Sequence, residues 1–222
     1  MTAAAEGMTA EPFPPLLRRS PVALDDRPLA TESRGGWRVV TRYADEDRGP
    51  WLVDLSHRAR WDVQDRDVGA AGPVAPAVPA TPGEVAVHRG LMVNRMNQTQ
   101  AAIWHVGPGP APTTPARVSC TETTDSHAWL AVLGERAPAV MERVTTLDLF
   151  PPGRQGPFLT QGPVLHIPCQ IVTWAADVVL IAVSRGYGQT FADALLDAAR
   201  DVRLRPGGER VFTRRAAELG RP

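Results

Sequence analysis

The sequence predicts an α+β protein whose sheets are antiparallel or mixed and carry packed helices. Strand-like runs follow one another directly, without the regular strand–helix alternation that a parallel sheet needs. Apolar residues recur at helical spacing in two longer stretches, 137–146 and 189–202, and in a short one at 214–219. With 222 residues, 43% of them apolar, the chain can form one large domain or two small ones.

The first half of the chain contains short candidate strands. They are rich in β-branched residues, alternate polar with apolar residues, or form short apolar runs. These segments are 37–43, 51–55, 60–64 and 101–106, and residues 84–93 recover some apolar character.

Two proline- and glycine-rich stretches, 69–83 and 107–116, predict surface loops within one domain, because neither half has enough strands to form a closed sheet alone. We expect this domain to span 18–206. Residues 1–17, rich in small residues and proline, are expected to form a flexible tail, and 207–222 a C-terminal tail.

The second half is more regularly patterned. An apolar strand over 127–133 reaches Gly134, and Pro138 then stands where the first turn of a helix tolerates proline. In the stretch 189–202, Phe191 and Leu195 begin an apolar stripe typical of an amphipathic helix. The other candidate strands are 117–122, 158–167, 170–174 and 178–184.

Composition and motifs exclude several functions. A net charge of +0 gives no support for a nucleic-acid partner. Two cysteines define no disulfide framework, five scattered histidines form no metal-ligand spacing, and no glycine cluster has a phosphate-loop frame. The start of the chain lacks the pattern of a secretory signal, and the apolar run 178–183 is too short to span a membrane. We therefore expect a cytoplasmic protein without metal or membrane contacts.

Residues 54–58, Asp-Leu-Ser-His-Arg, form the densest polar cluster. One interpretation is a ligand-contacting turn in which His57 or Arg58 faces an anion. The other is a solvated turn closed by the side chain of Asp54 or Ser56.

A second polar cluster, 95–100, leads into the candidate strand that contains Trp104 and His105. Its amides can hydrogen-bond a flat heterocycle, or they can hold a loop in place. The residues alone leave both interpretations open.

Several segments taken together, in order, resemble the glycine-cleavage T-protein superfamily, the folate-dependent aminomethyltransferases. The chain is most similar to the gamma subunit of heterotetrameric sarcosine oxidase, from about residue 18 to residue 202, with gaps at the proline-rich stretches. The segments that carry the resemblance are Arg18-Arg19-Ser20-Pro21, the stretch 53–63 with Asp54-Leu55-Ser56-His57, the strand–glycine–helix unit 130–141, Thr146-Leu147-Asp148-Leu149-Phe150-Pro151, and the strand and helix at 178–184 and 191–199.

This chain departs from the family at the residues that handle folate. T-proteins activate the one-carbon unit with an Asp in a segment Asn-Glu-Arg-Gly-Gly-Ile-hydrophobic-Asp-Asp, and in the matching stretch here Trp104 and His105 replace the carboxylates. A second family contact is a Glu in a Thr-Gly-Glu-Asp-Gly-Phe segment, where this chain has Ala176. An alanine side chain accepts no hydrogen bond from a pterin ring.

The resemblance indicates His105 as the candidate catalytic residue. The residues that it nominates for cofactor contact are Arg95, Asn97, Gln98, Trp104, His105 and Asp177.

The resemblance implies a non-catalytic subunit of an oxidase or demethylase complex that handles N-methyl groups. Larger partner subunits would carry the flavin, the NAD and the folate site, and Trp37, Trp51 and Trp61 are candidate interface anchors. The alternative is a free-standing tetrahydrofolate-dependent one-carbon transferase in which Arg95, Asn97 and His105 replace the missing carboxylate. A third class is a regulatory or repair factor that binds folate without chemistry.

Overall fold

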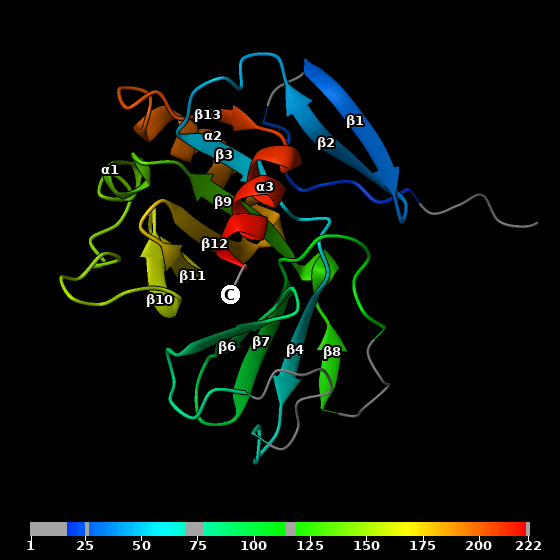
Figure 1. Ribbon diagram of the computed structural model, residues 1–222, viewed down its shortest axis with the longest axis vertical. Coiled ribbons are helices and arrows are strands. Elements are labelled where there is room, and N and C mark those ends of the chain that lie inside the picture. Colours follow the sequence, from blue (N-terminus) through cyan, green and yellow to red (C-terminus); the bar gives the residue numbers. More distant parts are fainter. Residues whose placement is uncertain (1–16, 25–26, 70–77, 114–118, 221–222) are drawn as a thin grey trace, which may run out of the picture.

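Two sheets face each other and enclose the central core (Figure 1). The computed structural model describes residues 17–24, 27–69, 78–113 and 119–220. The large sheet has the strand order β10-β11-β12-β9-β3-β13, the small sheet has the order β5-β6-β7-β4-β8, and β1 and β2 form a separate ribbon. β13 runs parallel to β3, whereas the other described strand pairs are antiparallel. The predicted α+β class with antiparallel and mixed sheets is confirmed.

The described elements follow one another along the chain as short strands with few helices. The strands are β1 (Pro28–Arg34), β2 (Trp37–Tyr43), β3 (Trp51–Asp54), β4 (Arg60–Gln64), β5 (Val85–His88), β6 (Leu91–Arg95), β7 (Gln100–His105), β8 (Cys120–Glu122), β9 (His127–Leu133), β10 (Phe158–Val164), β11 (Ile167–Ala175), β12 (Val178–Ser184) and β13 (Arg205–Gly207). The helices are α1 (Ala137–Met141), α2 (Gly188–Ala198) and α3 (Glu209–Leu219), with short 3-10 turns η1 (Thr124–Ser126) and η2 (Arg185–Tyr187).

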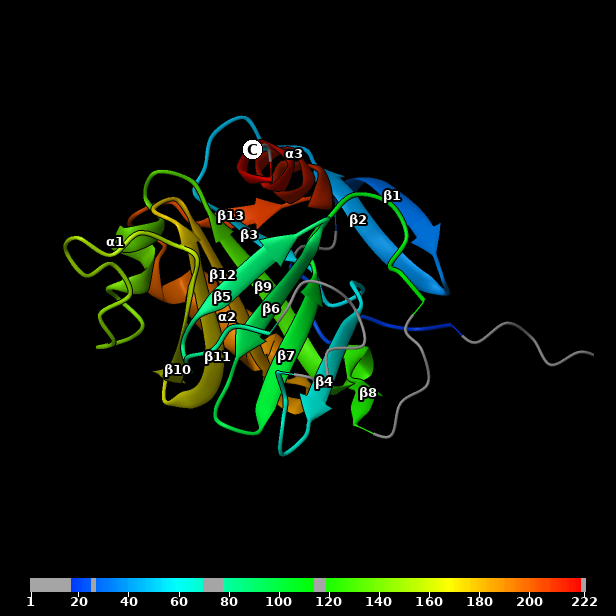
Figure 2. The ribbon, with the colours of Figure 1, turned by 60° about the horizontal axis from the view of Figure 1, so that its bottom comes forward.

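The central strands β9 and β12 are apolar on both faces because both faces of the large sheet are covered. In β12, Val179 and Ile181 pack toward one core and Leu180 and Ala182 toward the other, as the two-residue period of a strand requires. Figure 2 shows the resulting layers, with the small sheet in front of the large sheet and α2 behind it. The core between the sheets also receives Phe212 from α3.

Several elements differ from the prediction at their ends. The helix expected over 137–146 ends at Met141, and the helix expected over 189–202 is α2, which ends at Ala198. The strand expected over 158–167 stops at Val164, because Leu165 and His166 adopt positive φ angles of 51° and 65° and turn the chain into β11. Of the expected tail and loops, residues 1–16, 70–77 and 114–118 lie outside the described residues.

Residues 209–219, which lie in the expected C-terminal tail, form α3. This helix includes the short helix expected at 214–219 and begins five residues earlier. Val211, Phe212 and Ala216 are buried on one side of this helix. The helix packs against β2 and β3, and its Phe212 ring lies 6.4 Å from that of Trp174. This packing explains why the segment is ordered, since an isolated helix of this length is marginal in water.

Gly208 allows α3 to begin directly against β2. A Cβ atom at this position would lie 2.4 Å from the backbone nitrogen of Arg42 and from the carbonyl carbon and oxygen of Thr41. The backbone N–H of Gly208 also donates a hydrogen bond to the carboxylate of Glu46. The glycine pair 207–208 indicates a turn in the sequence, and in the structure Gly208 also permits the start of α3 to lie directly against β2.

We expect Gly208→Ala to lower the free energy of unfolding by about 1–3 kcal/mol, because backbone must move to admit the methyl group. The matched control is Gly186→Ala, where nothing lies within 4 Å of the added Cβ. Urea denaturation measures the free energy of unfolding of both variants. An equal decrease in the two would contradict the close contact at Gly208.

Candidate functional site

A cavity of about 670 Å³ lies where the two sheets, the ribbon and α3 meet. Its wall includes His57 and Arg58 from the β3–β4 turn, His105 from the end of β7, Glu209 from the start of α3, and Arg34 from the end of β1. Titratable groups from four distant segments thus converge on one space, which makes this cavity the candidate functional site.

The β3–β4 turn positions His57 and Arg58 because it crosses from the large sheet to the small one. Asp54 closes the turn: its Oδ1 accepts hydrogen bonds from the backbone nitrogen of Ser56 at 2.9 Å and from Ser56 Oγ at 2.6 Å. Ser56 Oγ in turn accepts a hydrogen bond from the backbone nitrogen of Trp129 at 3.1 Å. The turn is therefore closed by Asp54, as one sequence interpretation proposed, and fixed to β9. It is not solvated as that interpretation expected, because Ser56 and Arg58 are 1% and 7% exposed.

The same turn also faces an anion, which belongs to the chain itself. Glu209 Oε1 lies 2.9 Å from His57 Nε2 and accepts a hydrogen bond of 2.9 Å from Arg58 Nε, and Arg34 Nη1 donates to Oε2. The Glu209 side chain is 3% exposed. Among the described residues, Glu209 is the one acidic residue that is buried.

Burial alone would raise the pKa of Glu209, but the hydrogen bond from His57 and the charges of Arg58, His57 and Arg34 outweigh burial and lower the pKa to about 2. Burial lowers the pKa of Arg58, and the adjacent Glu209 carboxylate opposes that shift. Glu209 is consequently ionised at neutral pH and remains bound to His57 and to the two arginines.

Arg58 joins the cluster to the small sheet and to α3. Its Nη1 donates to the carbonyl oxygen of Gly107 at 2.8 Å, and its Nη2 donates to Thr213 Oγ1 at 3.2 Å. The guanidinium carbon lies 5.0 Å from the centre of the Phe212 ring, within cation–π range. These contacts make Arg58 part of the protein interior and leave Arg34 as the more exposed cation of the cluster.

His105, the candidate catalytic residue, lies in the wall of this cavity. Burial, with a further contribution from the Arg58 charge, lowers its pKa to about 4, although Glu209 opposes the shift. The imidazole is therefore neutral at pH 7. A group with this pKa is a poor general acid at neutral pH, because almost none of it carries a proton to give.

Arg95, Asn97 and Gln98 lie at the opposite end of β7 from His105 and hold a hairpin turn. Arg95 Nε donates to the carbonyl oxygen of Asn97 at 2.7 Å, and Arg95 Nη2 donates to that of Gln98 at 2.6 Å. Asn97 Oδ1 accepts a hydrogen bond from the backbone nitrogen of Thr99. The structure thus gives these residues the contacts of a loop anchor, and they line none of the cavity that contains His105.

Trp104 is fully buried between the two sheets. Its ring centre lies 5.4 Å from that of Trp129, and the guanidinium carbon of Arg60 lies 4.9 Å from the Trp104 ring and 5.9 Å from the Trp129 ring. Arg60 Nη2 donates to Gln170 Oε1 at 3.1 Å, and burial lowers the Arg60 pKa to about 9. The position where the family has a carboxylate is thus occupied by an aromatic core residue.

Asp177 lies in the β11–β12 turn and holds α3 in place. Its two carboxylate oxygens contact Arg215 Nη2 and Nε, each at 2.8 Å. Ala176, which occupies the position of the family's Glu, is exposed. Asp177 is therefore already engaged by a cation of the chain.

Two of the three candidate interface anchors are core residues. Trp37 and Trp61 are 3% and 4% exposed, so they are not available to a partner in this conformation, whereas Trp51 is half-buried.

Glu209 and Arg34 are the site residues that the sequence did not reveal. A signal for α3 was present, because Val211, Phe212, Ala216 and Leu219 have helical spacing and Glu209 precedes them, where a carboxylate suits the positive end of a helix. Nothing local connects this glutamate to Arg58, which lies 151 residues away in the chain.

In the part of the chain that the structure describes, no group of three or more His, Cys, Asp or Glu side chains could hold a metal ion. Cys120 and Cys169 are both free thiols. None of the described helices is long and apolar enough to cross a membrane.

Comparison with known proteins identifies the fold. No family model matches the sequence, and no curated protein matches it. A chain of the heterotetrameric sarcosine oxidase from Corynebacterium sp. U-96, solved with pyrrole 2-carboxylate, superposes with a TM-score of 0.58 at 16% identity, over 70% of this chain and 88% of that one. The glycine cleavage system aminomethyltransferase T from Bartonella henselae superposes with a TM-score of 0.57 at 18% identity, over 90% of this chain.

These similarities confirm the expected resemblance at the level of the fold, which is T-protein-like. This chain spans 61% of the length of the Bartonella aminomethyltransferase. At such low identities, the likeness establishes the scaffold and leaves the activity to be argued from the site.

We expect Glu209→Gln to lower the free energy of unfolding by about 3–5 kcal/mol, because it leaves the buried Arg58 without its counter-charge. The control is Glu218→Gln on the same helix, whose half-exposed carboxylate pairs with Arg215 and contributes about 1 kcal/mol at most. Urea denaturation at pH 7 compares the two variants. Equal decreases in the free energy of unfolding would show that the Glu209 cluster stabilises the fold no more than a half-exposed ion pair does.

Proposed function

We propose that this chain is a non-catalytic, T-protein-like subunit of a sarcosine-oxidase-like complex that oxidises or demethylates N-methyl amines. It acts in the cytoplasm, stabilises the assembly and lines the path of the one-carbon unit, while larger partner subunits carry the flavin, the NAD and the tetrahydrofolate site. One observation carries the proposal: Glu209, the buried carboxylate of the cavity, is already bonded to His57, Arg58 and Arg34.

A pterin ring presents N–H groups that need acceptors, and T-proteins supply them with carboxylates. Here Trp104 fills the interior where one carboxylate is expected, and exposed Ala176 stands at the other position. Each unpaired polar group of a bound ligand would cost about 1–3 kcal/mol. Folate turnover by this chain alone is therefore disfavoured.

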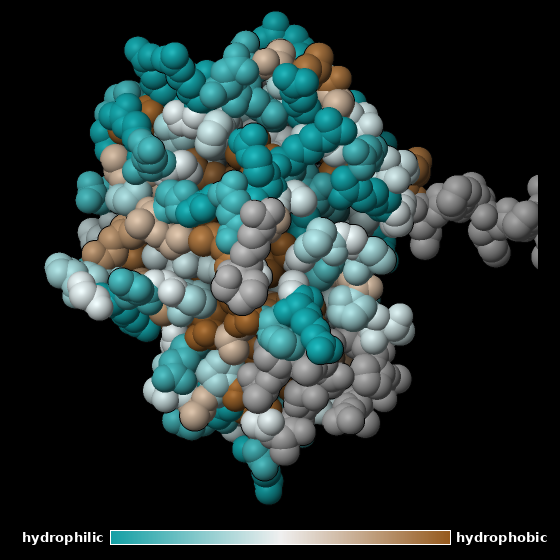
Figure 3. All heavy atoms as spheres, in the orientation of Figure 1, coloured by the Kyte–Doolittle hydropathy of each residue, from teal (hydrophilic) through white to brown (hydrophobic). Residues whose placement is uncertain are grey.

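Apolar surface is available for a partner. Figure 3 shows hydrophobic side chains gathered in the groove between the upper part of the molecule, with the large sheet and helices, and the lower part, with the small sheet. Val85, Val87, Ala175 and Leu219 are half-buried at the margin of the core between the sheets. A partner subunit that covers this margin would complete the burial of these side chains.

The match to the heterotetrameric enzyme supports the same proposal. It spans 88% of that enzyme's chain, with a TM-score of 0.58.

The alternative, a free-standing tetrahydrofolate-dependent one-carbon transferase, is favoured by one observation. His105 lines a cavity of about 670 Å³ beside Arg58, a space large enough for a small ligand. Its low pKa restricts it to accepting a hydrogen bond or a proton.

Titration of the purified chain with tetrahydrofolate, followed by calorimetry, separates the two proposals. We expect no saturable binding in the micromolar range, where a complex would be worth about 8 kcal/mol. Micromolar binding that disappears in His105→Ala would instead establish the transferase and overturn the subunit proposal.

Co-expression with the large subunits of a sarcosine-oxidase-type enzyme tests the assembly directly. We expect the chain to co-purify with them, and Val87→Arg to weaken the association by placing a charge at the margin of the core between the sheets. Leu29→Arg is the control, because Leu29 is 58% exposed on the ribbon and away from the groove. A chain that remains a monomer beside such subunits would contradict the proposal.

A further inference from the structure

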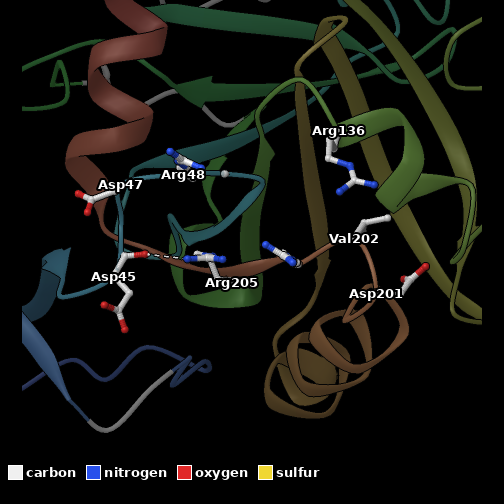
Figure 4. Close-up of a pocket in the computed structure, with 9 residues that line it drawn as sticks. Asp45, Asp47, Arg48, Arg136, Asp201, Val202 and Arg205 are labelled. Carbon is white, nitrogen blue, oxygen red and sulfur yellow. Dashed lines mark hydrogen bonds between the residues drawn. The ribbon is translucent and has the colours of Figure 1, made fainter.

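A second cavity, of about 640 Å³, is separate from the Glu209 cluster and is lined mostly by charged residues (Figure 4). Four arginines contribute to it: Arg48 from the β2–β3 loop, Arg136 from the β9–α1 turn, Arg203 from the segment between α2 and β13, and Arg205 from the start of β13. The three loops meet at this end of the large sheet because β13 pairs with β3 and β3 pairs with β9.

In the described part of the chain, none of the four guanidinium groups has a carboxylate partner. Within the described residues, no carboxylate lies within ion-pair distance of any of them, although Arg205 Nη1 makes a long hydrogen bond of 3.4 Å to the carbonyl oxygen of Asp45. Asp201 also lines the cavity, but its carboxylate is already paired with Arg143. Arg143 Nε donates to Asp201 Oδ1 at 2.8 Å, and Arg143 Nη2 lies 2.5 Å from Oδ2. The positive charges of the cavity are therefore not neutralised by Asp201.

The backbone holds one of these arginines in an uncommon conformation. Arg203 has a φ angle of 64°, a left-handed region that residues other than glycine seldom adopt. Val202 and Leu204 on either side are buried at 2% and 7% exposure, so the turn is anchored and Arg203 is directed outward. Backbone strain of this kind is characteristic of functional positions.

We propose that this arginine cavity binds a small phosphorylated metabolite, a phosphomonoester or diphosphate that carries hydroxyl groups. A guanidinium group binds oxyanions through a planar fork of N–H donors, and one carboxylate has too few oxygens to use four such forks. A phosphate or diphosphate group offers enough oxygens on several sides.

The acidic residues of the cavity add hydrogen-bond acceptors for the hydroxyl groups of the proposed ligand. Figure 4 shows Asp45 and Asp47 to the left of Arg205, with Arg48 above Arg205 and Arg136 on the opposite side of the space. Phosphate oxygens would lie among the arginines, and ligand hydroxyl groups would donate hydrogen bonds to the free carboxylates of Asp45 and Asp47. This site is independent of the proposed function, because it shares no residue with the Glu209 cavity.

Calorimetric titration of the full chain with inorganic pyrophosphate tests the site. We expect saturable binding of one ion per chain, and about tenfold weaker binding in Arg136→Gln and in Arg48→Gln, because each variant removes one charged hydrogen-bonding fork. Arg42→Gln is the matched control: it removes the same charge from an exposed position on β2 outside the cavity.

Citrate and heparin serve as comparison probes. Preferential binding of pyrophosphate over citrate supports a phosphate site, whereas equal binding of citrate overturns that ligand class. Heparin binding that Arg42→Gln weakens as much as Arg136→Gln does would indicate a diffuse cationic surface and overturn the site. Absence of saturable pyrophosphate binding by the folded chain, with an unchanged melting temperature in its presence, would also overturn it.

Discussion

The interaction on which the structure depends is the burial of the Glu209 carboxylate among His57, Arg58 and Arg34. These four residues come from α3, the turn between the two sheets, and the ribbon. A buried carboxylate is stable only when cations and hydrogen bonds replace the water it has lost. The cluster therefore fixes the C-terminal helix over the gap between the sheets.

The same interaction shapes the functional conclusion. A T-protein-like scaffold needs free carboxylates to hold a pterin ring, and the carboxylate that this cavity contains is neutralised from within. Trp104 and Arg60 fill the neighbouring interior with a cation between aromatic rings. These side chains have structural contacts in the interior, which is the basis of our proposal that partner chains carry the one-carbon chemistry.

The strands and faces of the large sheet could be predicted from the sequence because they depend on local alternation, as in β12. The ribbon strand β1 could not, since most of its residues are exposed and no apolar alternation marks it. β13 could not be predicted either, because it has only three residues, including a proline and a glycine. The dense polar cluster at 54–58 pointed to His57 and Arg58, but their partner Glu209 depends on a contact across 151 residues that no local pattern encodes. The residues nominated at 95–98 serve a turn, because the motif that suggested them had lost the carboxylates that give it chemistry.

The ionisation of Glu209 tests this account most directly. A carboxyl group whose pKa is depressed stabilises the fold above its ordinary pKa, and that stabilisation is lost as the pH falls toward the depressed value. A carbon-13 NMR titration of the Glu209 side-chain carboxyl should give a pKa of about 2, against an ordinary value of 4.5. A measured pKa at or above the ordinary value would mean that the carboxylate is not held by Arg58, Arg34 and His57, and the account would be wrong.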